Sequence, residues 1–293
     1  MTEKNHKSGY AAIIGKPNAG KSTLMNRILG TKISITTHKP QTTRHQVVGI
    51  YSDDDTQIIF LDTPGVISPK YELQKAMMKT VERARKDADL ILFIFDPTDT
   101  HPTDEVIELL RTINKPILLI VNKIDVINKE KADRKTSLIE KNLKLAGVHY
   151  VSALNGEGIK ELIDDIRTYL MPGPPFYPKE DLSEHPIRFF VSELIREQVF
   201  LQCHDEIPYS CTVNVINYEA GSDLDRINAE IIVNRKSQKG MLIGKGGEAI
   251  KNLGIKSRKT IEELVGKQVF LDLHVKVREK WREKENWVRN LGY

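Results

Sequence analysis

A glycine-rich segment near the N-terminus limits what this chain can fold into more than any other feature. Residues 15–22 read Gly-Lys-Pro-Asn-Ala-Gly-Lys-Ser, after the apolar run Tyr10–Ile14 and before apolar residues at helical spacing over Ser22–Leu29. This order predicts a strand, a loop and a helix, in which backbone N–H groups and the positive end of the helix dipole face a phosphate. An accidental glycine-rich turn is the alternative, and the flanking elements argue against it.

The residues of this loop have distinct expected roles. The Lys21 ammonium should reach the β- and γ-phosphates of a nucleotide, and the Ser22 hydroxyl should bind Mg²⁺. The loop residues expected to contact the nucleotide are Gly15, Asn18, Ala19, Gly20, Lys21, Ser22 and Thr23.

Length and composition are those of a soluble protein with about two domains. The chain has 293 residues, of which 40% are hydrophobic and 29% charged, and its formal net charge is +4. The longest apolar runs, Leu90–Phe95 and Ile117–Val121, are too short to span a membrane, and residues 1–8 lack the apolar core of a signal peptide. Cys203 and Cys211 lack metal-ligand spacing, so we expect reduced packing residues in a cytoplasmic protein.

Strand-like and helix-like segments alternate after the loop. This alternation predicts an α/β fold with a doubly wound, mostly parallel sheet whose ligand loops lie at the carboxyl ends of the strands. The expected strands are 47–51, 57–61, 90–95, 117–121 and 149–151, and the expected helices are 71–86, 103–113, 133–146 and 157–170.

Three further motifs, each after an expected strand, identify the ligand. Asp62 begins Asp-Thr-Pro-Gly and can hold Mg²⁺ through a water, while the Gly65 N–H can contact the γ-phosphate. The second motif, Asn-Lys-Ile-Asp, runs from Asn122 to Asp125, whose carboxylate can accept from both N1–H and the exocyclic amine of guanine.

Three other residues are expected to contact the guanine base or to support the loop that binds it. Asn122 can brace the loop and the purine N7, and the Lys123 stem can cover a base face. In the third motif, Ser152-Ala153, the Ala153 N–H can donate to guanine O6. Four motifs in this order predict a site for GTP and GDP.

The chain here resembles the translation-factor-like GTPases, and Thr36–Arg44 resembles the mobile first switch of their Era branch. The resemblance implies that Thr43 closes onto Mg²⁺ in the GTP state, with Thr42 as the alternative. The implied metal ligands are then Ser22, Thr43 and Asp62; a solvated threonine-rich loop is the competing interpretation.

One departure from Ras-type enzymes bears on the rate. Val66 follows Gly65, where those enzymes have a glutamine that orients the attacking water, so we expect slow turnover. Asn18 matches the position at which GTPases related to Era hold K⁺, which would substitute for an arginine finger; a loop brace is the alternative role. The expected catalytic residues are Lys21, Thr43, Gly65 and Asn18.

A proline-rich stretch, residues 171–178, predicts a break between two domains. We expect a nucleotide-binding domain at 1–170, a linker at 171–185 and a second domain at 186–293. The second domain should contain helix 186–202, strands 210–218 and 226–234, a helical turn at 239–243, a basic helix to 265, strand 269–277 and a helix at 279–290.

The second domain carries a basic segment around the sequence Gly-Lys-Gly-Gly at 244–247. Over Arg235–Lys259 there are eight Lys or Arg and one acid, Glu248. The order of elements around Gly-x-x-Gly resembles the type II KH module, an α+β fold that clamps single-stranded RNA. The implied RNA contacts are Gly244, Lys245, Gly246, Gly247, Lys251, Lys256, Arg258 and Lys259.

Taken over nearly the whole chain, the two motif sets resemble the Era family of ribosome-assembly GTPases. This resemblance implies binding to the 3′ end of 16S ribosomal RNA, assistance to maturation of the 30S subunit, a monomeric state and peripheral association with the inner membrane. A GTP-switched scaffold that docks on protein or anionic lipid is the alternative function.

Overall fold

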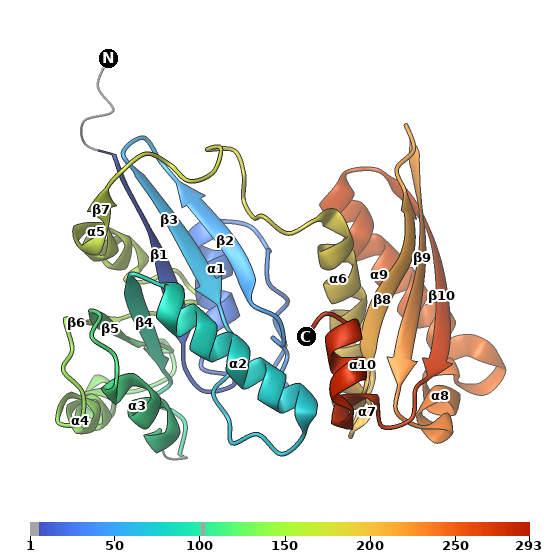
Figure 1. Cartoon of the computed structure of the whole chain (residues 1–293), viewed down its shortest axis with the longest axis horizontal. Helices are drawn as coiled ribbons and strands as arrows, with labels where there is room; N and C mark the ends of the chain where they lie inside the picture. The colour runs from blue at the N-terminus through green and yellow to red at the C-terminus, as the bar shows by residue number, and fades with distance from the viewer. Residues whose placement is uncertain (1–5, 101–102) are drawn as a thin grey trace. The chain divides into compact units, whose positions relative to one another are not determined.

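The structure, a computed structural model, describes residues 6–100 and 103–293 and divides into two compact units (Figure 1). The first unit runs to Glu184 and the second begins at His185, except that Tyr71–Ala76 groups with the second. Within the described ranges, no helix is both long and apolar enough to cross a membrane.

The first unit contains a seven-stranded sheet in the order β2-β3-β1-β4-β5-β6, with β7 paired to β1. Pairing is parallel throughout, except that β2 runs antiparallel to β3 and β7 antiparallel to β1. The doubly wound, mostly parallel sheet expected from the sequence is therefore confirmed. The strands are β1 (Lys7–Ile14), β2 (Val47–Ser52), β3 (Thr56–Asp62), β4 (Leu90–Phe95), β5 (Ile117–Val121), β6 (Gly147–Tyr150) and β7 (Met171–Pro172).

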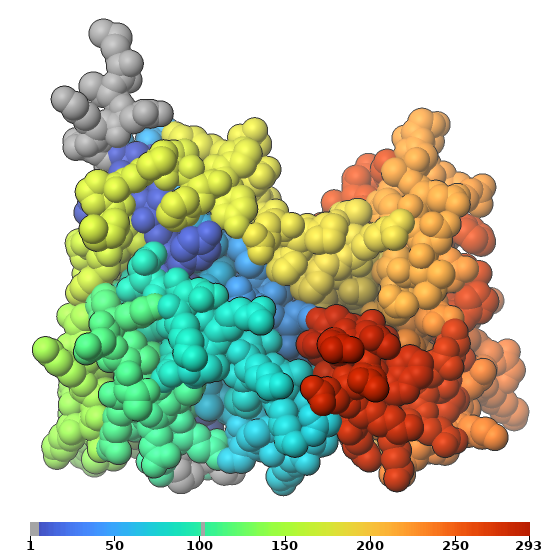
Figure 2. Space-filling view, viewed as in Figure 1, coloured from blue at the N-terminus to red at the C-terminus, as the bar shows by residue number. Residues whose placement is uncertain are grey.

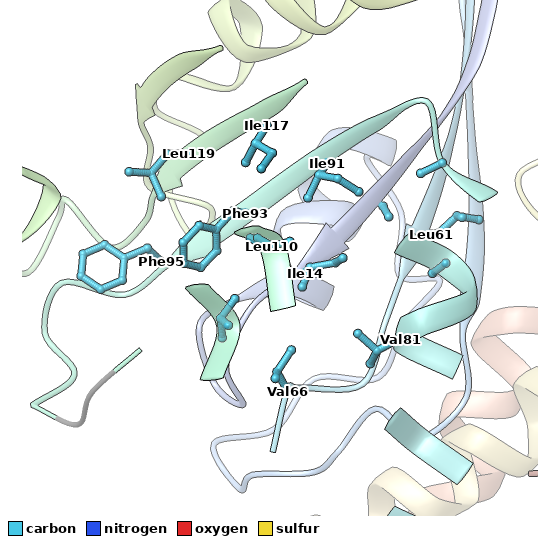
Figure 3. Packing of buried hydrophobic residues seen from close by; sticks show 14 of the residues in the cluster. Ile14, Leu61, Val66, Val81, Ile91, Phe93, Phe95, Leu110, Ile117 and Leu119 are labelled. Atoms are coloured by element: carbon cyan, nitrogen blue, oxygen red, sulfur yellow. The ribbon is translucent and has the colours of Figure 1, made fainter. Parts of the chain in front are cut away.

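Helices cover both faces of this sheet, because alternate residues of each buried strand point to opposite sides. The helices are α1 (Lys21–Leu29), α2 (Glu72–Asp87), α3 (Asp104–Arg111), α4 (Lys129–Glu140) and α5 (Ile159–Tyr169). Val81 of α2 and Leu110 of α3 pack with Ile91 and Phe93 of β4 in one buried cluster (Figure 3). In Figure 1, α2 and α3 lie in front of the sheet and α1 lies behind it.

Helix α4 begins four residues earlier than the sequence predicted. The expected start was Asp133, but the Asn128 side chain caps the helix by accepting a hydrogen bond of 2.8 Å from the Glu130 N–H. An asparagine at this position satisfies an N–H that would otherwise lack a partner.

The proline-rich stretch is attached to the first unit by hydrogen bonds. Gln57 of β3, which is fully buried, accepts from the Phe176 and Tyr177 N–H groups and donates to the Tyr177 carbonyl oxygen at 2.8 Å. Farther along, the Ile50 N–H donates to the Leu182 carbonyl oxygen at 2.9 Å. In Figure 2 the yellow segment that follows α5 partly covers the blue N-terminal strands of this unit.

The second unit has a three-stranded sheet in the order β10-β9-β8, in which β9 and β10 are parallel and β8 and β9 antiparallel. Its elements are α6 (Ile187–Gln202), α7 (Ile207–Ser210), β8 (Thr212–Glu219), β9 (Leu224–Val233), α8 (Lys236–Ile243), η1 (Lys245–Gly247), α9 (Glu248–Val265), β10 (Gln268–Val277), η2 (Trp281–Glu283) and α10 (Glu285–Asn290).

The C-terminal segment corrects one expectation. A single helix was predicted over 279–290, but the chain forms the short turn η2 and then α10. Trp281 is fully buried and its ring N–H donates to the Ser210 carbonyl oxygen at 2.9 Å. The helix is interrupted just before this residue, because Lys280 takes a left-handed backbone conformation at φ 55°.

Candidate functional site

A pocket of about 430 Å³ opens in the first unit beside the carboxyl ends of the strands, where doubly wound sheets bind their ligands. Ten of the residues predicted from sequence line it: Asn18, Gly20, Lys21, Ser22, Thr23, Thr43, Gly65, Asn122, Lys123 and Asp125. Five others lie buried around it: Gly15, Ala19, Asp62, Ser152 and Ala153.

The phosphate-type loop between β1 and α1 requires glycine at two positions. A Cβ on Gly15 would lie 2.4 Å from the Ile94 carbonyl oxygen, and one on Gly20 would lie 2.2 Å from the Asn122 amide nitrogen. Gly20 also has a φ of 101° and directly precedes the first residue of α1. The backbone can therefore approach both β4 and the loop after β5 while it turns into the helix.

Lys21 is held inside this loop rather than in solvent. Its side chain is 6% exposed, and its ammonium donates to the carbonyl oxygens of Gly15 at 3.2 Å and Lys16 at 2.7 Å. Burial lowers the pKa of Lys21 to about 8, an effect that the nearby Asp62 partly offsets. A bound phosphate would place a negative charge beside this buried ammonium and favour its charged form.

Two hydroxyls and one carboxylate meet at the base of the pocket. The Ser22 hydroxyl donates to Asp62 Oδ2 at 2.6 Å and lies 2.9 Å from the Thr43 hydroxyl. Asp62 is fully buried, and its pKa is raised by burial, an effect partly offset by the bond from Ser22 and the charge of Lys21. Asp62 Oδ1 is buried without a hydrogen-bond partner in the described part of the chain.

Thr42 and Thr43 face different surroundings. The Thr42 hydroxyl donates to the Lys39 carbonyl oxygen at 2.7 Å and lies 2.7 Å from the Thr37 hydroxyl, within its own segment. Thr43 instead contacts Ser22. The structure thus places the Thr43 hydroxyl beside Ser22, whose own hydroxyl donates to Asp62.

Asn122 connects the two loops that flank the pocket. Its amide donates to the Ala19 carbonyl oxygen at 2.8 Å, and its side-chain oxygen accepts from the Ala153 N–H at 3.0 Å. The Ala153 N–H, expected to face a base oxygen, is engaged by Asn122 here. Asp125 is exposed at the pocket wall, beside Val126 and Leu154, which are both 65% exposed.

Sequence reasoning missed several residues that hold these loops. Arg27 of α1 donates to the Ala153 carbonyl oxygen at 3.2 Å and also to that of Leu154. Asp96, directly after β4, pairs with the Lys123 ammonium at 2.6 Å. Asp96 could have been found by its place at a strand end, whereas no local pattern marks Arg27.

Lys16 is a partly buried residue of the loop. Its ammonium pairs with the Asp99 carboxylate at 2.5 Å, and both side chains are less than one quarter exposed. Asn18 is exposed, has a φ of 61° and donates to the His38 carbonyl oxygen at 3.0 Å. The loop is therefore connected both to the segment after β4 and to the threonine-rich segment.

Gly65 and Val66 form a close contact with the loop. The Val66 N–H donates to the Gly15 carbonyl oxygen at 3.0 Å, and a Cβ on Gly65 would lie 2.5 Å from the Pro17 nitrogen. Val66 is 7% exposed and belongs to the hydrophobic core. Its side chain offers no group that could hold a water by hydrogen bonding.

The second unit presents its Gly-x-x-Gly segment as an open turn between α8 and α9. Gly244, Gly246 and Gly247 have φ values of 75°, 62° and 82°. A Cβ on Gly244 would lie 2.7 Å from the Ala249 Cβ, whereas no atom lies within 4 Å of one on Gly246 or Gly247. A ligand could thus approach the backbone closely at the last two glycines.

The basic residues predicted to contact RNA are exposed, but they do not share one side of α9. Lys245, Lys251, Lys256, Arg258 and Lys259 are all solvent-exposed. At 3.6 residues per turn, Lys251 and Arg258 lie within about 20° of each other around the helix, whereas Lys256 lies roughly 140° from Lys251. Lys251 and Arg258 can therefore contact the same ligand surface more readily than Lys256 can.

Two family models match the chain. A model described as 50S ribosome-binding GTPase matches residues 10–123, and a model described as KH domain matches residues 206–282.

Similar proteins extend over almost the whole length. The chain is 41% identical to GTPase Era of Carboxydothermus hydrogenoformans over 99% of this chain and 98% of that protein. It is 42% identical to GTPase Era of Geotalea uraniireducens over the full length of both. A chloroplastic GTPase ERA1 of Zea mays is 44% identical, covering 99% of this chain and 71% of that protein.

Two solved structures superpose with a TM-score of 0.93 at 37% identity, covering 98% of this chain and 99% of theirs. One is Era in complex with MgGDPNP and nucleotides 1506–1542 of 16S ribosomal RNA. The other is a single-residue variant of Aquifex aeolicus Era bound to GDP·AlF4⁻. Because these relatives match the chain over almost its whole length and both family models lie within it, the chain belongs to the Era family of GTPases.

Proposed function

We propose that this chain is a GTP-driven switch that binds the 3′ end of 16S ribosomal RNA and assists maturation of the 30S subunit. GTP hydrolysis is the activity of the family to which the chain belongs. The observation that carries the RNA part is the Era complex with MgGDPNP and nucleotides 1506–1542, because that protein matches this one in both units.

The proposed nucleotide contacts follow the geometry of the pocket. The loop from Gly15 to Thr23 holds the phosphates, with the Lys21 ammonium at the β- and γ-phosphates. Asp125 accepts from the guanine N1–H and amine, and Lys123 covers a base face with its stem. Asn122 braces the loops, as its bonds to Ala19 and Ala153 support.

The residues at the base of the pocket fit a magnesium ion. Mg²⁺ prefers oxygen ligands and retains several waters. The Ser22 and Thr43 hydroxyls are 2.9 Å apart, and the carboxylate that accepts from Ser22 keeps one buried oxygen without a partner in the described structure. We assign Ser22 and Thr43 as direct ligands and Asp62 as a ligand through water; the ion would neutralise charge on the phosphates when bound.

Hydrolysis in this protein is proposed to be slow without help. Val66 is buried and apolar, so it cannot orient the attacking water. The Gly65 N–H would face the γ-phosphate, and Asn18 would hold a K⁺ ion that could supply the positive charge of an arginine finger. Turnover measured in KCl should exceed that in NaCl, and Asn18→Ala should remove the difference; equal rates in both salts would exclude this role.

Nucleotide state and RNA binding are proposed to be coupled. GTP draws the threonine-rich segment and the Gly65 loop inward, which raises the affinity of the KH domain for RNA, and hydrolysis reverses this change. By linkage, RNA that favours the GTP state should tighten GTP binding by the same factor.

The experiment that tests the proposal is an RNA-binding titration with a 37-nucleotide RNA equivalent to positions 1506–1542. The affinity should be higher with a non-hydrolysable GTP analogue than with GDP. Equal affinities would contradict the coupling, and no RNA binding in either state would contradict the assigned partner.

The proposal includes the domain boundaries, the oligomeric state and the location of the protein in the cell. We assign residues 1–170 to the GTPase domain, 171–185 to the linker and 186–293 to the KH domain, in a cytoplasmic monomer that associates peripherally with the inner membrane. Exposed cations on α9 would also attract anionic lipid. Pelleting with anionic liposomes, alone and with competing RNA, would show whether lipid replaces RNA as the partner.

A further inference from the structure

A serine outside the four nucleotide motifs contacts the carboxylate at the base of the pocket. Asp62 Oδ2 accepts two hydrogen bonds, from the Ser22 hydroxyl at 2.6 Å and from the Ser34 hydroxyl at 2.9 Å. Ser34 is 2% exposed and Asp62 is fully buried. Both donors therefore bind the same oxygen, and Asp62 Oδ1 is the one left without a partner in the described structure.

Asn26 fixes the position of that serine. Its side-chain oxygen accepts from the Ile33 and Ser34 N–H groups, each at 2.9 Å, and its amide donates to the Ser34 carbonyl oxygen at 2.7 Å. Asn26 lies four residues after Ser22 on α1, so both side chains project from the same face of one helix. Helix α1 thus places both hydroxyl donors, Ser22 directly and Ser34 through Asn26.

We propose that Ser34 is a positioning residue for the magnesium site, holding Asp62 so that Oδ2 is occupied and Oδ1 is presented to the metal-bound water. This inference rests on the proposed magnesium ligands and adds Ser34 and Asn26 to them. Partners that orient a metal-binding carboxylate typically affect metal affinity by about 10–100-fold.

The physical reason lies in the rotation of the carboxylate. With Ser22 as its sole donor, Asp62 could turn about its last side-chain bond, which has broad and roughly two-fold preferences. A second donor on the same oxygen restricts that rotation. Ser34 lies outside the proposed metal ligands, so its hydroxyl can hold Asp62 Oδ2 without taking part in coordination.

The test measures binding of a fluorescent GDP to the full-length protein, in Mg²⁺ and in EDTA. Ser34→Ala should raise the Mg²⁺ concentration needed for half-maximal tightening of GDP by about tenfold or more, while leaving GDP affinity in EDTA within about twofold. Ser34→Thr, which keeps the hydroxyl, should restore most of the magnesium response.

Two further variants separate positioning from general stability. Ser8→Ala is the matched control, because Ser8 is also buried in the first unit; its hydroxyl donates to the Pro174 carbonyl oxygen at 2.8 Å and lies 3.3 Å from His6 Nδ1. It should leave the magnesium response unchanged. Asn26→Asp keeps the acceptor and removes the amide donor, so it should shift the response in the same direction as Ser34→Ala without touching the Ser34 hydroxyl.

A Ser34→Ala protein with the wild-type magnesium response, or with equal loss in Mg²⁺ and EDTA, would overturn the inference. If Ser34→Ala does not fold, a wild-type magnesium response in Asn26→Asp would overturn it. If GDP binding to the wild-type protein does not respond to Mg²⁺ at all, the proposed metal site itself is wrong.

Discussion

Single side chains in the first unit connect segments that are far apart in sequence. Asn122, after β5, contacts both the phosphate-type loop and the loop after β6, so its carboxamide serves as donor and acceptor at once. Arg27 adds a second connection from α1 to Ala153 and Leu154. The loop after β6 is therefore held from two sides, by Asn122 and by Arg27.

Asp125 is the residue expected to select guanine over other bases. Asp125→Asn should lower GDP affinity by roughly two orders of magnitude, because two charge-assisted bonds of about 1.5 kcal/mol each are lost. The same variant should gain affinity for xanthine nucleotides, since its amide can donate where the carboxylate accepted. Competition between GDP and XDP for the site measures this exchange.

The control for this prediction is Asp54→Asn, which removes an exposed carboxylate at the turn between β2 and β3. It should leave both affinities unchanged. Undiminished preference of Asp125→Asn for guanine would exclude the assigned role of Asp125.

At the scale of elements, the hairpin of β8 and β9 depends on a buried carboxylate. Asp225 accepts from the Tyr218 hydroxyl at 2.5 Å and the Gly221 N–H at 3.0 Å, and it pairs with the Lys267 ammonium at 3.0 Å. The Tyr218 hydroxyl, with smaller help from Lys267 and Gly221, lowers the pKa of Asp225. Burial and the bond to Asp225 raise the pKa of Tyr218 to about 12.

The direction of this shift predicts how stability depends on pH. A carboxyl group whose pKa is lower in the folded state stabilises the fold above its unfolded pKa, and the contribution is lost as the pH falls through the folded pKa. Asp225→Asn should therefore lower the free energy of unfolding at pH 7, and the difference from wild type should shrink below about pH 4. Denaturant unfolding at a series of pH values measures this.

Asp223→Asn, two residues away and exposed, is the matched control and should show little effect at any pH. A difference between Asp225→Asn and wild type that stays constant from pH 7 to pH 3 would contradict the electrostatic explanation.

At the scale of the whole molecule, the two functions use residues in separate compact units. The pocket belongs to the first unit and the Gly-x-x-Gly turn to the second. A substitution in one unit should therefore change its own ligand binding and leave the other activity measurable.

Gly246→Asp tests this separation. A Cβ added at Gly246 meets no atom within 4 Å, and aspartate tolerates the left-handed backbone at φ 62°, so the fold should survive. Its charge would repel an RNA backbone, and binding of a short single-stranded RNA should be lost while intrinsic GTP hydrolysis stays near wild type. Gel shift and phosphate-release assays measure the two activities.

Gly266→Asp is the control, because Gly266 ends α9 with a φ of 72° and equally open surroundings. It should retain RNA binding. Loss of GTP hydrolysis in Gly246→Asp, or retained RNA affinity, would contradict the proposed division of labour.

The sheet class, the succession of the longer strands and helices, and the motifs that line the pocket could all be predicted from the sequence. The short elements β7 and α7 could not. The features that could be predicted are local: strand and helix periodicity, glycines that permit a tight loop, and short motifs at strand ends can each be seen within a few residues. Boundaries cannot be predicted from periodicity where a cap sets them, as Asn128 does for α4, or where burial sets them, as Trp281 does near the C-terminus.

Which distant groups come into contact depends on how the chain packs in three dimensions. That Thr43 contacts Ser22 while Thr42 does not, and that Ser34 donates to Asp62, depends on the path of a loop that has no periodic pattern. Hydrogen bonds of this kind require positions correct to a few tenths of an ångström, and those positions follow from packing around α1 and β3. Local sequence patterns carry no such information, because the partners are separated by 21 to 28 residues.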